Sequence, residues 1–176
     1  MKVAGVARRS VWREGGRVGI IDQTRLPFEF RTLQLSSPEE VAQAIGSMQV
    51  RGAPLIGATA AYGLALAMSA DASDAALAQA ARLLGATRPT AVNLRWAIER
   101  MCRRLQPLTT RERPSGAWQE AAEIADEDVE LNLAIGRHGL ALLRNIANKK
   151  GRVNLLTHCN AGWLATVDAG TALAPI

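Results

Sequence analysis

Two of the few chemically reactive side chains in this sequence are adjacent. The chain has two cysteines and two histidines, and His158 and Cys159 lie together in the stretch LLTHCNAGWLATVDAG at 155–170. An apolar run precedes Cys159 and small residues follow it, so we expect the thiol at a strand end beside a helix start. A helix N-terminus lowers a thiol pKa and holds anions. Spacing alone leaves two interpretations open, a reactive thiol or a structural cysteine packed beneath a loop.

Two arginines precede expected helix starts and raise a related question. Arg51 lies in VRGAPLIG, and Arg88 lies in TRPTAVNL just before Thr90, which we expect to be an N-cap. A guanidinium can hold a phosphate through two parallel hydrogen bonds. The alternative at each position is an ordinary joint between helices with a solvated arginine. Together with the strand-end cysteine and a pI near 10.0, the two arginines favour an anionic small molecule.

Composition limits the class of protein. The 176 residues are 48% apolar and carry a net charge of +5, which fits one packed domain, or one domain and part of another. No dense basic run interleaved with aromatic residues is present, so nucleic-acid binding is not indicated. No signal peptide is evident, and the small-residue stretch near residue 60 indicates a packed helix, so we expect no membrane segment. Two cysteines are too few for a disulfide framework and favour the cytoplasm.

The remaining reactive side chains have simpler interpretations. Cys102 falls on the apolar stripe of an expected helix, where a buried and inert thiol is the usual case. His138 lies in a later expected helix and has no nearby partner in the sequence for a metal site. We therefore expect no metal centre.

A small sheet and five helices must position the candidate residues. The stretch SVWREGGRVGIID predicts a hairpin around Gly15-Gly16, and QTRLPFEFRTLQL predicts a further extended segment whose Pro27 keeps it at an edge or turn. Ser37, Pro38 and Glu40 form the pattern of a capping box at the first helix, and Gly52 suits a left-handed position at the end of that helix. Further helices are expected from about 54 to 70, 74 to 84, 90 to 105 and 117 to 148, the last ending at Gly151.

The end of the sequence has a different pattern. Val153–Thr157 is a continuous apolar run, which predicts a buried parallel strand, and AGWLATVDAGTALAPI predicts a helix after it. Strand, tight loop and helix together are the opening of a βαβ unit. Because a lone parallel strand cannot satisfy its own backbone groups, we expect this unit to continue in a longer protein or to be completed by a partner.

Four motifs together resemble one family, the methylthioribose-1-phosphate isomerases. They are DQTRLP (22–27), VRGAPLIGATAAYG (50–63), TRPTAVNLRWA (87–97) and LLTHCNAGWLATVDAGTAL (155–173). They occur in the family's order and spacing, and they span nearly the whole chain. The family is related to the regulatory subunits of the guanine-nucleotide exchange complex of a translation initiation factor.

The resemblance implies a fold, an activity and a setting. It implies an α+β N-terminal domain at 1–150, made of a small antiparallel sheet and a helical bundle. Residues 151–176 would then be the first strand–helix unit of a truncated Rossmann-like α/β catalytic domain. The implied enzyme is an aldose–ketose isomerase that converts 5-methylthioribose 1-phosphate to 5-methylthioribulose 1-phosphate in methionine salvage. It would be a cytoplasmic homodimer with a sugar-phosphate substrate, no cofactor and no metal.

The resemblance also implies roles for particular residues. Arg51, Gly52 and Ala53 would bind substrate, Arg88 would be a further substrate ligand, and Cys159 would be the catalytic cysteine. The family's catalytic aspartate lies in the second domain and is not Asp168. We therefore expect the chain to hold half of an active site and to be inactive alone.

Two other functions stay open. One is isomerisation of ribose 1,5-bisphosphate, which shares the arginine and cysteine motifs. The other is a non-enzymatic regulatory subunit like the translation-factor relatives, in which the paired cysteine and aspartate are expected to be absent. Retention of THCNAG favours an enzyme.

Overall fold

The computed structural model describes residues 1–176 and begins with five short strands. β1 (Lys2–Val3) and β2 (Val6–Ala7) pair with each other, and β3 (Val11–Glu14), β4 (Arg17–Ile21) and β5 (Thr32–Leu35) form an antiparallel sheet in the order β3-β4-β5. The predicted hairpin is confirmed, because Glu14 pairs with Arg17 across Gly15-Gly16 and Gly15 has a φ of +61°. A two-residue hairpin loop needs such a positive φ.

Five helices follow, close to the predicted positions. They are α1 (Pro38–Gly46), α2 (Ala53–Ala70), α3 (Asp74–Gly85), α4 (Val92–Leu105) and α5 (Arg113–Lys150). At α1 the Ser37 hydroxyl accepts from the Glu40 amide at 3.2 Å, and the Glu40 carboxylate accepts from the Ser36 amide at 2.6 Å. The capping box is therefore present, with its return bond made one residue earlier than in the standard pattern. Gly151 ends α5 with a φ of +68°, as expected for a left-handed cap.

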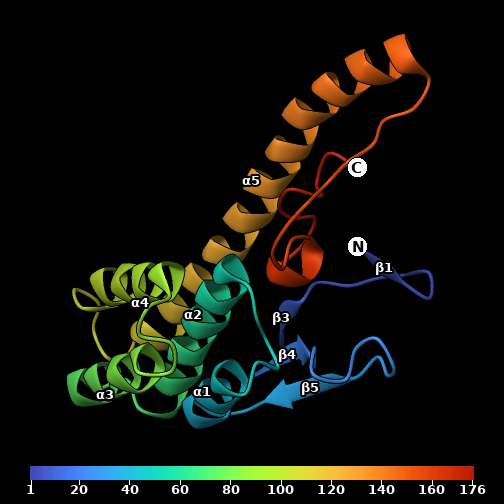
Figure 1. The fold of residues 1–176 in the computed structure, drawn as a ribbon. Coiled ribbons are helices and arrows are strands. Elements are labelled where there is room, and N and C mark those ends of the chain that lie inside the picture. The colour runs from blue at the N-terminus through green and yellow to red at the C-terminus, as the bar shows by residue number, and fades with distance from the viewer.

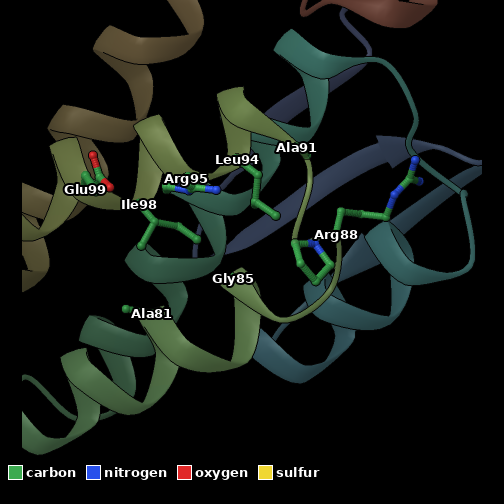
Figure 2. Close-up of a pocket in the computed structure, with 9 residues that line it drawn as sticks. Ala81, Gly85, Arg88, Ala91, Leu94, Arg95, Ile98 and Glu99 are labelled. Atoms are coloured by element: carbon green, nitrogen blue, oxygen red, sulfur yellow. The ribbon is translucent and has the colours of Figure 1, made fainter.

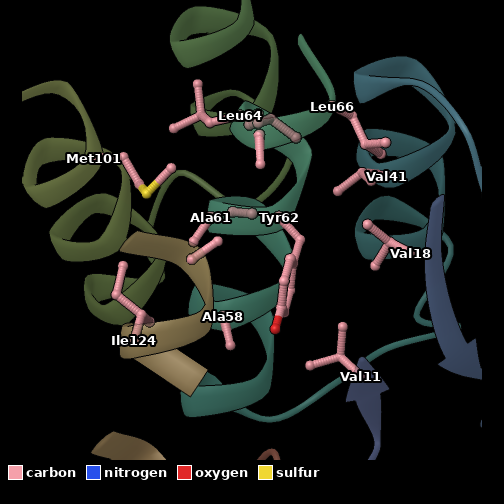
Figure 3. Packing of buried hydrophobic residues seen from close by; sticks show 14 of the residues in the cluster. Val11, Val18, Val41, Ala58, Ala61, Tyr62, Leu64, Leu66, Met101 and Ile124 are labelled. Carbon is pink, nitrogen blue, oxygen red and sulfur yellow. The ribbon is translucent and has the colours of Figure 1, made fainter. Parts of the chain in front are cut away.

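Helix α2 is the centre of the fold. The sheet and α1 pack on one side of it and α3, α4 and α5 surround the rest, while the second half of α5 extends beyond the bundle (Figure 1). Figure 3 shows Val11, Val18 and Val41 around Tyr62 on one side of α2, with Met101 and Ile124 on the other. A Cβ at Gly57 would lie 2.9 Å from the Asn93 carbonyl oxygen. The small residues of α2 therefore allow close approach of neighbouring backbones, as predicted.

By length and composition α2 could also cross a membrane. Its 18-residue stretch has a mean hydropathy of 1.4, yet 78% of that stretch is buried against the rest of the chain. Burial on nearly every face is the environment of a core helix, because a helix that is apolar all round must be covered by other parts of the protein or by lipid.

Three local expectations about helix and strand ends are wrong. The expected extended segment is too long, since only Thr32–Leu35 forms a strand and Phe28 is 97% exposed, although residues 23–28 form turns as one of the two alternatives for Pro27 predicted. Thr90 does not cap α4; Ala91 is the N-cap and gives no side-chain bond. Gly52 is not at the end of α1 but is the N-cap of α2, with a φ of +108°.

The expected strand at 153–157 and the helix after it are also absent. Residues 152–158 have no regular structure, and the only helical turn beyond them is η1 (Trp163–Ala165). The physical reason is the one that the sequence indicates: a parallel strand needs neighbouring strands to receive its N–H and C=O groups, and this chain offers none there. The antiparallel sheet and the helices of the fold class are present, whereas its Rossmann-like strand–helix unit does not form in this chain.

The segment after α5 instead runs back beside that helix and packs between it and the N-terminal strands (Figure 1). Two α5 glycines make room for it. A Cβ at Gly136 would lie 2.8 Å from the Ala174 carbonyl oxygen, and one at Gly139 would lie 2.4 Å from the Pro175 ring. The last residues are therefore attached to the fold although they form neither a strand nor an α-helix.

Candidate functional site

The structure brings the arginine motif and the cysteine motif together, 109 residues apart in sequence. The Arg51 Nη2 donates to the Asn160 side-chain oxygen at 3.3 Å. Beside this contact, Gly52 lies directly against Ala165, since a Cβ at Gly52 would be 2.4 Å from the Ala165 Cα. The loop that leads into α2 therefore contacts the segment that carries Cys159.

The segment around η1 is held by hydrogen bonds from three separate parts of the chain. The Gln23 side chain donates to the Leu164 carbonyl at 2.6 Å, and the Ser10 amide donates to the Val167 carbonyl at 2.9 Å. From the other side, the Asp128 carboxylate accepts from the Val167 amide at 2.7 Å. These bonds fix the position of the backbone just after Asn160, and with it the contact to Arg51.

Gln23 also holds the arginine loop. Its backbone amide donates to the Gln49 carbonyl at 2.9 Å, two residues before Arg51, while its side chain holds Leu164. The side chain is 9% exposed. One residue of the DQTRLP motif therefore bonds to both segments of the candidate site.

The two helices that follow the arginines start without a side-chain cap. Gly52 and Ala91, the N-caps of α2 and α4, offer no side-chain hydrogen bond. In contrast, Ser37 caps α1 and Ser73 caps α3. The first amides of a helix have no acceptor within it, so an uncapped start is available to an anion. At α2 these amides begin at Ala53, two residues after Arg51 in the chain, and Pro54 offers none because proline has no N–H.

Cys159 lies at the exposed end of this arrangement. The residue is exposed and has a φ of +74°, a left-handed conformation that is uncommon for a residue with a side chain. His158 beside it is also exposed. The sequence correctly indicates a thiol next to small residues. The strand that was expected to carry it is missing, and an irregular turn carries it instead.

Arg88 is the one predicted ligand that the structure does not join to the others. It lines a cavity of about 180 Å³ between α3 and α4, with Leu94, Arg95 and Ile98 among the other lining residues. Figure 2 shows its side chain extending away from those three. Arg51 and Arg88 both lack a carboxylate partner within the chain, unlike Arg9, Arg100, Arg104 and Arg113. Both charges are therefore free to meet an anion.

Sequence reasoning missed a groove of about 510 Å³ beside the start of α2. It runs between α2, α4 and α5, and its lining includes Pro54, Val92, Trp96, Ile124, Leu131 and Asp128. Burial raises the pKa of the Asp128 carboxyl, while the hydrogen bonds from Val167 and Asn132 act in the opposite direction. The groove is mainly apolar and adjoins the arginine loop without containing Arg51 or Cys159.

Two other contributors, Gln23 and Asn160, lie within the recognised motifs, but residue type and spacing alone do not indicate their roles. Each motif supplied the signal, since Gln23 lies in DQTRLP and Asn160 follows Cys159 directly. Their roles depend on contacts more than 100 residues away in sequence, which spacing does not indicate.

Known proteins match this chain over nearly its whole length. A protein named methylthioribose-1-phosphate isomerase from Gluconobacter oxydans is 59% identical, over all of this chain and 50% of its own length. One of the same name from Rhodospirillum centenum is 61% identical, over all of this chain and 48% of its own. The chain therefore spans about half the length of the curated relatives it matches. The resemblance that the four motifs predicted is confirmed.

Solved structures agree in fold. The 5-methylthioribose 1-phosphate isomerase of Pyrococcus horikoshii has a TM-score of 0.83 at 41% identity, over 96% of this chain and 48% of that one. The translation initiation factor eIF-2B subunit delta of A. fulgidus has a TM-score of 0.82 at 40% identity, over 96% of this chain and 50% of that one. The model of the initiation factor 2 subunit family matches residues 49–173. Since this match covers more than half of the chain and includes both segments of the candidate site, the chain belongs to the initiation factor 2 subunit family.

Proposed function

We propose that this chain supplies the N-terminal half of the active site of an isomerase that converts 5-methylthioribose 1-phosphate to 5-methylthioribulose 1-phosphate. The observation that carries the proposal is the contact between Arg51 and Asn160, which joins the arginine loop to the cysteine segment. The names of the relatives at about half coverage support the same reaction. Substrate, activity and partners remain properties of the longer protein that those relatives represent.

The roles follow from the chemistry of the substrate. Its anomeric oxygen carries phosphate, so the sugar cannot open to an aldehyde by simple loss of a proton. The isomerisation must break the C1–O bond of the ring and move hydrogen from C2 to C1. Arg51 and the first amides of α2 hold the dianion, and Arg88 is a second cation for the same ligand. The Cys159 thiol stabilises the transition state or moves a proton, paired with a carboxylate from the second half of the protein.

The wider organisation is part of the proposal. Residues 1–150 form the N-terminal domain, and residues 151–176 begin a Rossmann-like domain in which 153–157 becomes a parallel strand once neighbouring strands are present. The complete protein is a cytoplasmic homodimer that uses neither metal nor redox cofactor. A change from irregular chain to strand at 153–157 is consistent with the exposure of Leu155 and Leu156, which are 51% and 100% exposed here.

A second candidate function is a regulatory subunit without catalytic activity. It is favoured by the A. fulgidus structure, whose TM-score of 0.82 is close to the 0.83 of the isomerase structure. Fold therefore does not separate the two functions, because one fold supports many sites. The Cys159 thiol, next in sequence to the Asn160 that Arg51 contacts, is the feature that favours the enzyme.

The experiment that tests the proposal uses a hybrid protein, in which this chain is followed by the second half of the Gluconobacter oxydans relative. Turnover is measured with 5-methylthioribose 1-phosphate and with ribose 1,5-bisphosphate. We expect turnover of the methylthio sugar and little of the bisphosphate. The reverse preference would assign the related isomerase activity, and a folded hybrid with no turnover of either sugar would support the regulatory subunit.

Cys159→Ser gives a direct test of the thiol. In the hybrid protein we expect kcat to fall by about 10² to 10⁴-fold, the usual contribution of a positioned acid–base group, with a small change in KM. Cys102→Ser is the matched control, because that thiol is half-buried in α4 and burial raises its pKa, which keeps it protonated. An unchanged kcat in Cys159→Ser would remove the catalytic role of Cys159.

A further inference from the structure

Asn160 holds an unpaired donor inside the candidate site. Its side-chain oxygen accepts from Arg51, whereas its side-chain nitrogen is buried and has no hydrogen-bond partner in the chain. The orientation of the amide is fixed by its neighbour. A guanidinium carries only donors, so the oxygen must face Arg51 and the NH₂ group must be the one that is unpaired.

An unpaired buried donor requires an explanation. Nearly all buried polar groups in native proteins have a partner, because desolvation without a hydrogen bond is costly. Every other buried side-chain nitrogen and oxygen in this structure has one. The acceptor for the Asn160 NH₂ group must therefore come from outside this chain.

The charge beside it indicates what kind of acceptor fits. Arg51 makes its only side-chain hydrogen bond to Asn160 and has no carboxylate partner. The first amides of α2, which follow Arg51 closely in the chain, have no side-chain cap. Guanidinium, helix amides and the Asn160 NH₂ group are all donors, and a cluster of donors that includes a full positive charge favours an anionic oxygen over a neutral carbonyl.

We propose that Asn160 is a ligand-binding residue, which orients the Arg51 guanidinium through its oxygen and donates through its nitrogen to an oxygen of the anion that Arg51 holds. The identity of that anion as the phosphate of a sugar phosphate rests on the proposed function. The donor role itself rests only on the unpaired NH₂ group and its neighbours. Asn160 thus adds a neutral, directional donor to a site in which the arginine supplies charge.

The test uses the hybrid protein and compares Asn160→Ala, Asn160→Asp and, as a matched control, Asn148→Ala. Asn148 is exposed near the end of α5 and makes no side-chain hydrogen bond. Binding of inorganic phosphate is measured by calorimetry, which needs no turnover, and KM and kcat are measured with the sugar phosphate. Thermal unfolding without ligand shows whether each variant is folded.

Asn160→Ala should weaken phosphate binding and raise KM by about tenfold each, because one hydrogen bond to a charged group is lost and Arg51 is less constrained. Asn160→Asp keeps an acceptor for Arg51 but replaces the donor with a carboxylate. Its loss of phosphate binding should therefore exceed that of Asn160→Ala at pH 8 and shrink toward it as the pH falls and the carboxyl gains a proton. A residue that only supported the fold would give no such pH dependence.

The outcomes separate the two proposals. The role of Asn160 would be overturned if Asn160→Ala bound phosphate within about twofold of the unsubstituted hybrid, because one kcal/mol corresponds to roughly fivefold in affinity. This conclusion would hold whether or not the hybrid turns over sugar. Loss of phosphate binding in Asn160→Ala but not in Asn148→Ala would support the role of Asn160, even in a hybrid with no isomerase activity. If the hybrid bound phosphate in this way but had no isomerase activity, the proposed function would be wrong and the anion site would still be supported.

Discussion

At the scale of single residues, the close contact at Gly52 accounts for the position of the arginine loop. Its φ of +108° lies in a region that favours glycine, and there is no space for a Cβ between it and the Ala165 backbone. A side chain here would move either the loop before α2 or the segment after Cys159. The contact between Arg51 and Asn160 depends on the positions of both of these segments.

Gly52→Ala should therefore cost stability and binding together. We expect a loss of about 3 kcal/mol in the free energy of unfolding, from backbone strain and from overlap with Ala165. Urea unfolding of the 176-residue chain measures it. Gly46→Ala is the matched control, because Gly46 ends α1, has no atom within 4 Å of its absent Cβ and should gain a few tenths of a kcal/mol. Equal midpoints for the two variants would contradict this account of Gly52.

At the scale of elements, the DQTRLP stretch after β4 links the two segments of the site. Gln23 is the residue that does so, with its amide on Gln49 and its side chain on Leu164. Because neither bond involves the proposed ligand, Gln23 is a positioning residue. It acts by limiting the movement of Arg51 relative to Cys159.

Gln23→Ala should raise KM in the hybrid protein by about tenfold and lower stability by about 1 kcal/mol, the net value of one buried hydrogen bond. A conservative variant, Gln23→Asn, distinguishes a positioning role from a general loss of stability. Gln23→Asn keeps the carboxamide but is one methylene shorter, so it should recover stability more than KM. Gln79→Ala, at an exposed position of α3, should change neither quantity. If Gln79→Ala and Gln23→Ala gave the same KM, the positioning role would be lost.

The helices α4 and α5 are joined by an ion network on the wall of the apolar groove. Arg100 donates to the buried Glu120 at 2.6 Å and to both carboxylate oxygens of Glu127, and it stacks 5.5 Å from the Trp96 ring centroid. The hydrogen bonds from Arg100 lower the pKa of the Glu127 carboxyl from its ordinary value of 4.5. Arg104 lies 3.6 Å from Glu120 and supports the same carboxylate more weakly.

Arg100→Met should destabilise the chain at pH 7 by about 1–2 kcal/mol, less than for a fully buried pair because Glu127 is 52% exposed. The sign of the pH dependence follows from the pKa. Glu127 is held below its unfolded value, so its contribution is complete above pH 4.5 and is lost as the pH falls through the lowered folded value. The difference in the free energy of unfolding between Arg100→Met and the unsubstituted chain should therefore become smaller below pH 4.5. Urea unfolding at a series of pH values measures it. Arg103→Met, exposed on the same helix, should show no such narrowing.

How much the sequence predicts differs between elements for a physical reason. Helices α1 to α5 are specified locally, by caps such as Ser37 and by apolar stripes such as the one that carries Leu94 and Met101, so periodicity locates them within a few residues. The segment 152–170 is specified by distant contacts. Its apolar run has the composition of a strand, but its partners for pairing are absent, and Ser10, Gln23 and Asp128 determine its path instead.

The same distinction applies to the candidate site. Residue types and motif spacing indicated Arg51, Gly52 and Cys159, and the structure brings their segments together. The contact that joins them involves Asn160, whose role depends on folding across 109 residues. The role of Arg88 stays a prediction, since the residue lines a cavity between α3 and α4 while its side chain extends away from Leu94, Arg95 and Ile98 (Figure 2).

At the scale of the whole molecule, one buried arginine joins three parts of the helical bundle. Arg113 at the start of α5 is 5% exposed and donates to the carbonyls of Ala72, Leu105 and Leu108 at 2.8, 3.1 and 3.1 Å. It also pairs with Asp74 at 2.5 Å. It thereby supplies a donor to the Ala72 carbonyl in the α2–α3 connection and to the Leu108 carbonyl in the α4–α5 connection. It also gives a second donor to the Leu105 carbonyl, which accepts from the Leu108 amide at 3.1 Å. Only a planar guanidinium presents donors in enough directions to reach all of them.

Arg113→Lys should therefore be strongly destabilising although it conserves charge. The guanidinium serves five acceptors, because it also donates to the Gln106 carbonyl at 3.3 Å. A lysine ammonium has only three N–H donors, so at least two of the five acceptors lose their donor, at a cost of about 2–3 kcal/mol. For a chain of this length that corresponds to a fall in Tm of roughly 5–10 °C. Arg111→Lys, two residues earlier and exposed, is the control and should leave Tm unchanged.

Because α2 packs against every other helix of the bundle, the loss of stability in Arg113→Lys should appear as a single transition at lower temperature, by both far-UV and tryptophan signals. Separate transitions for the two signals would contradict this account. They would mean that α5 is held independently of Arg113, and that the fold around Arg51 does not depend on the contacts of Arg113.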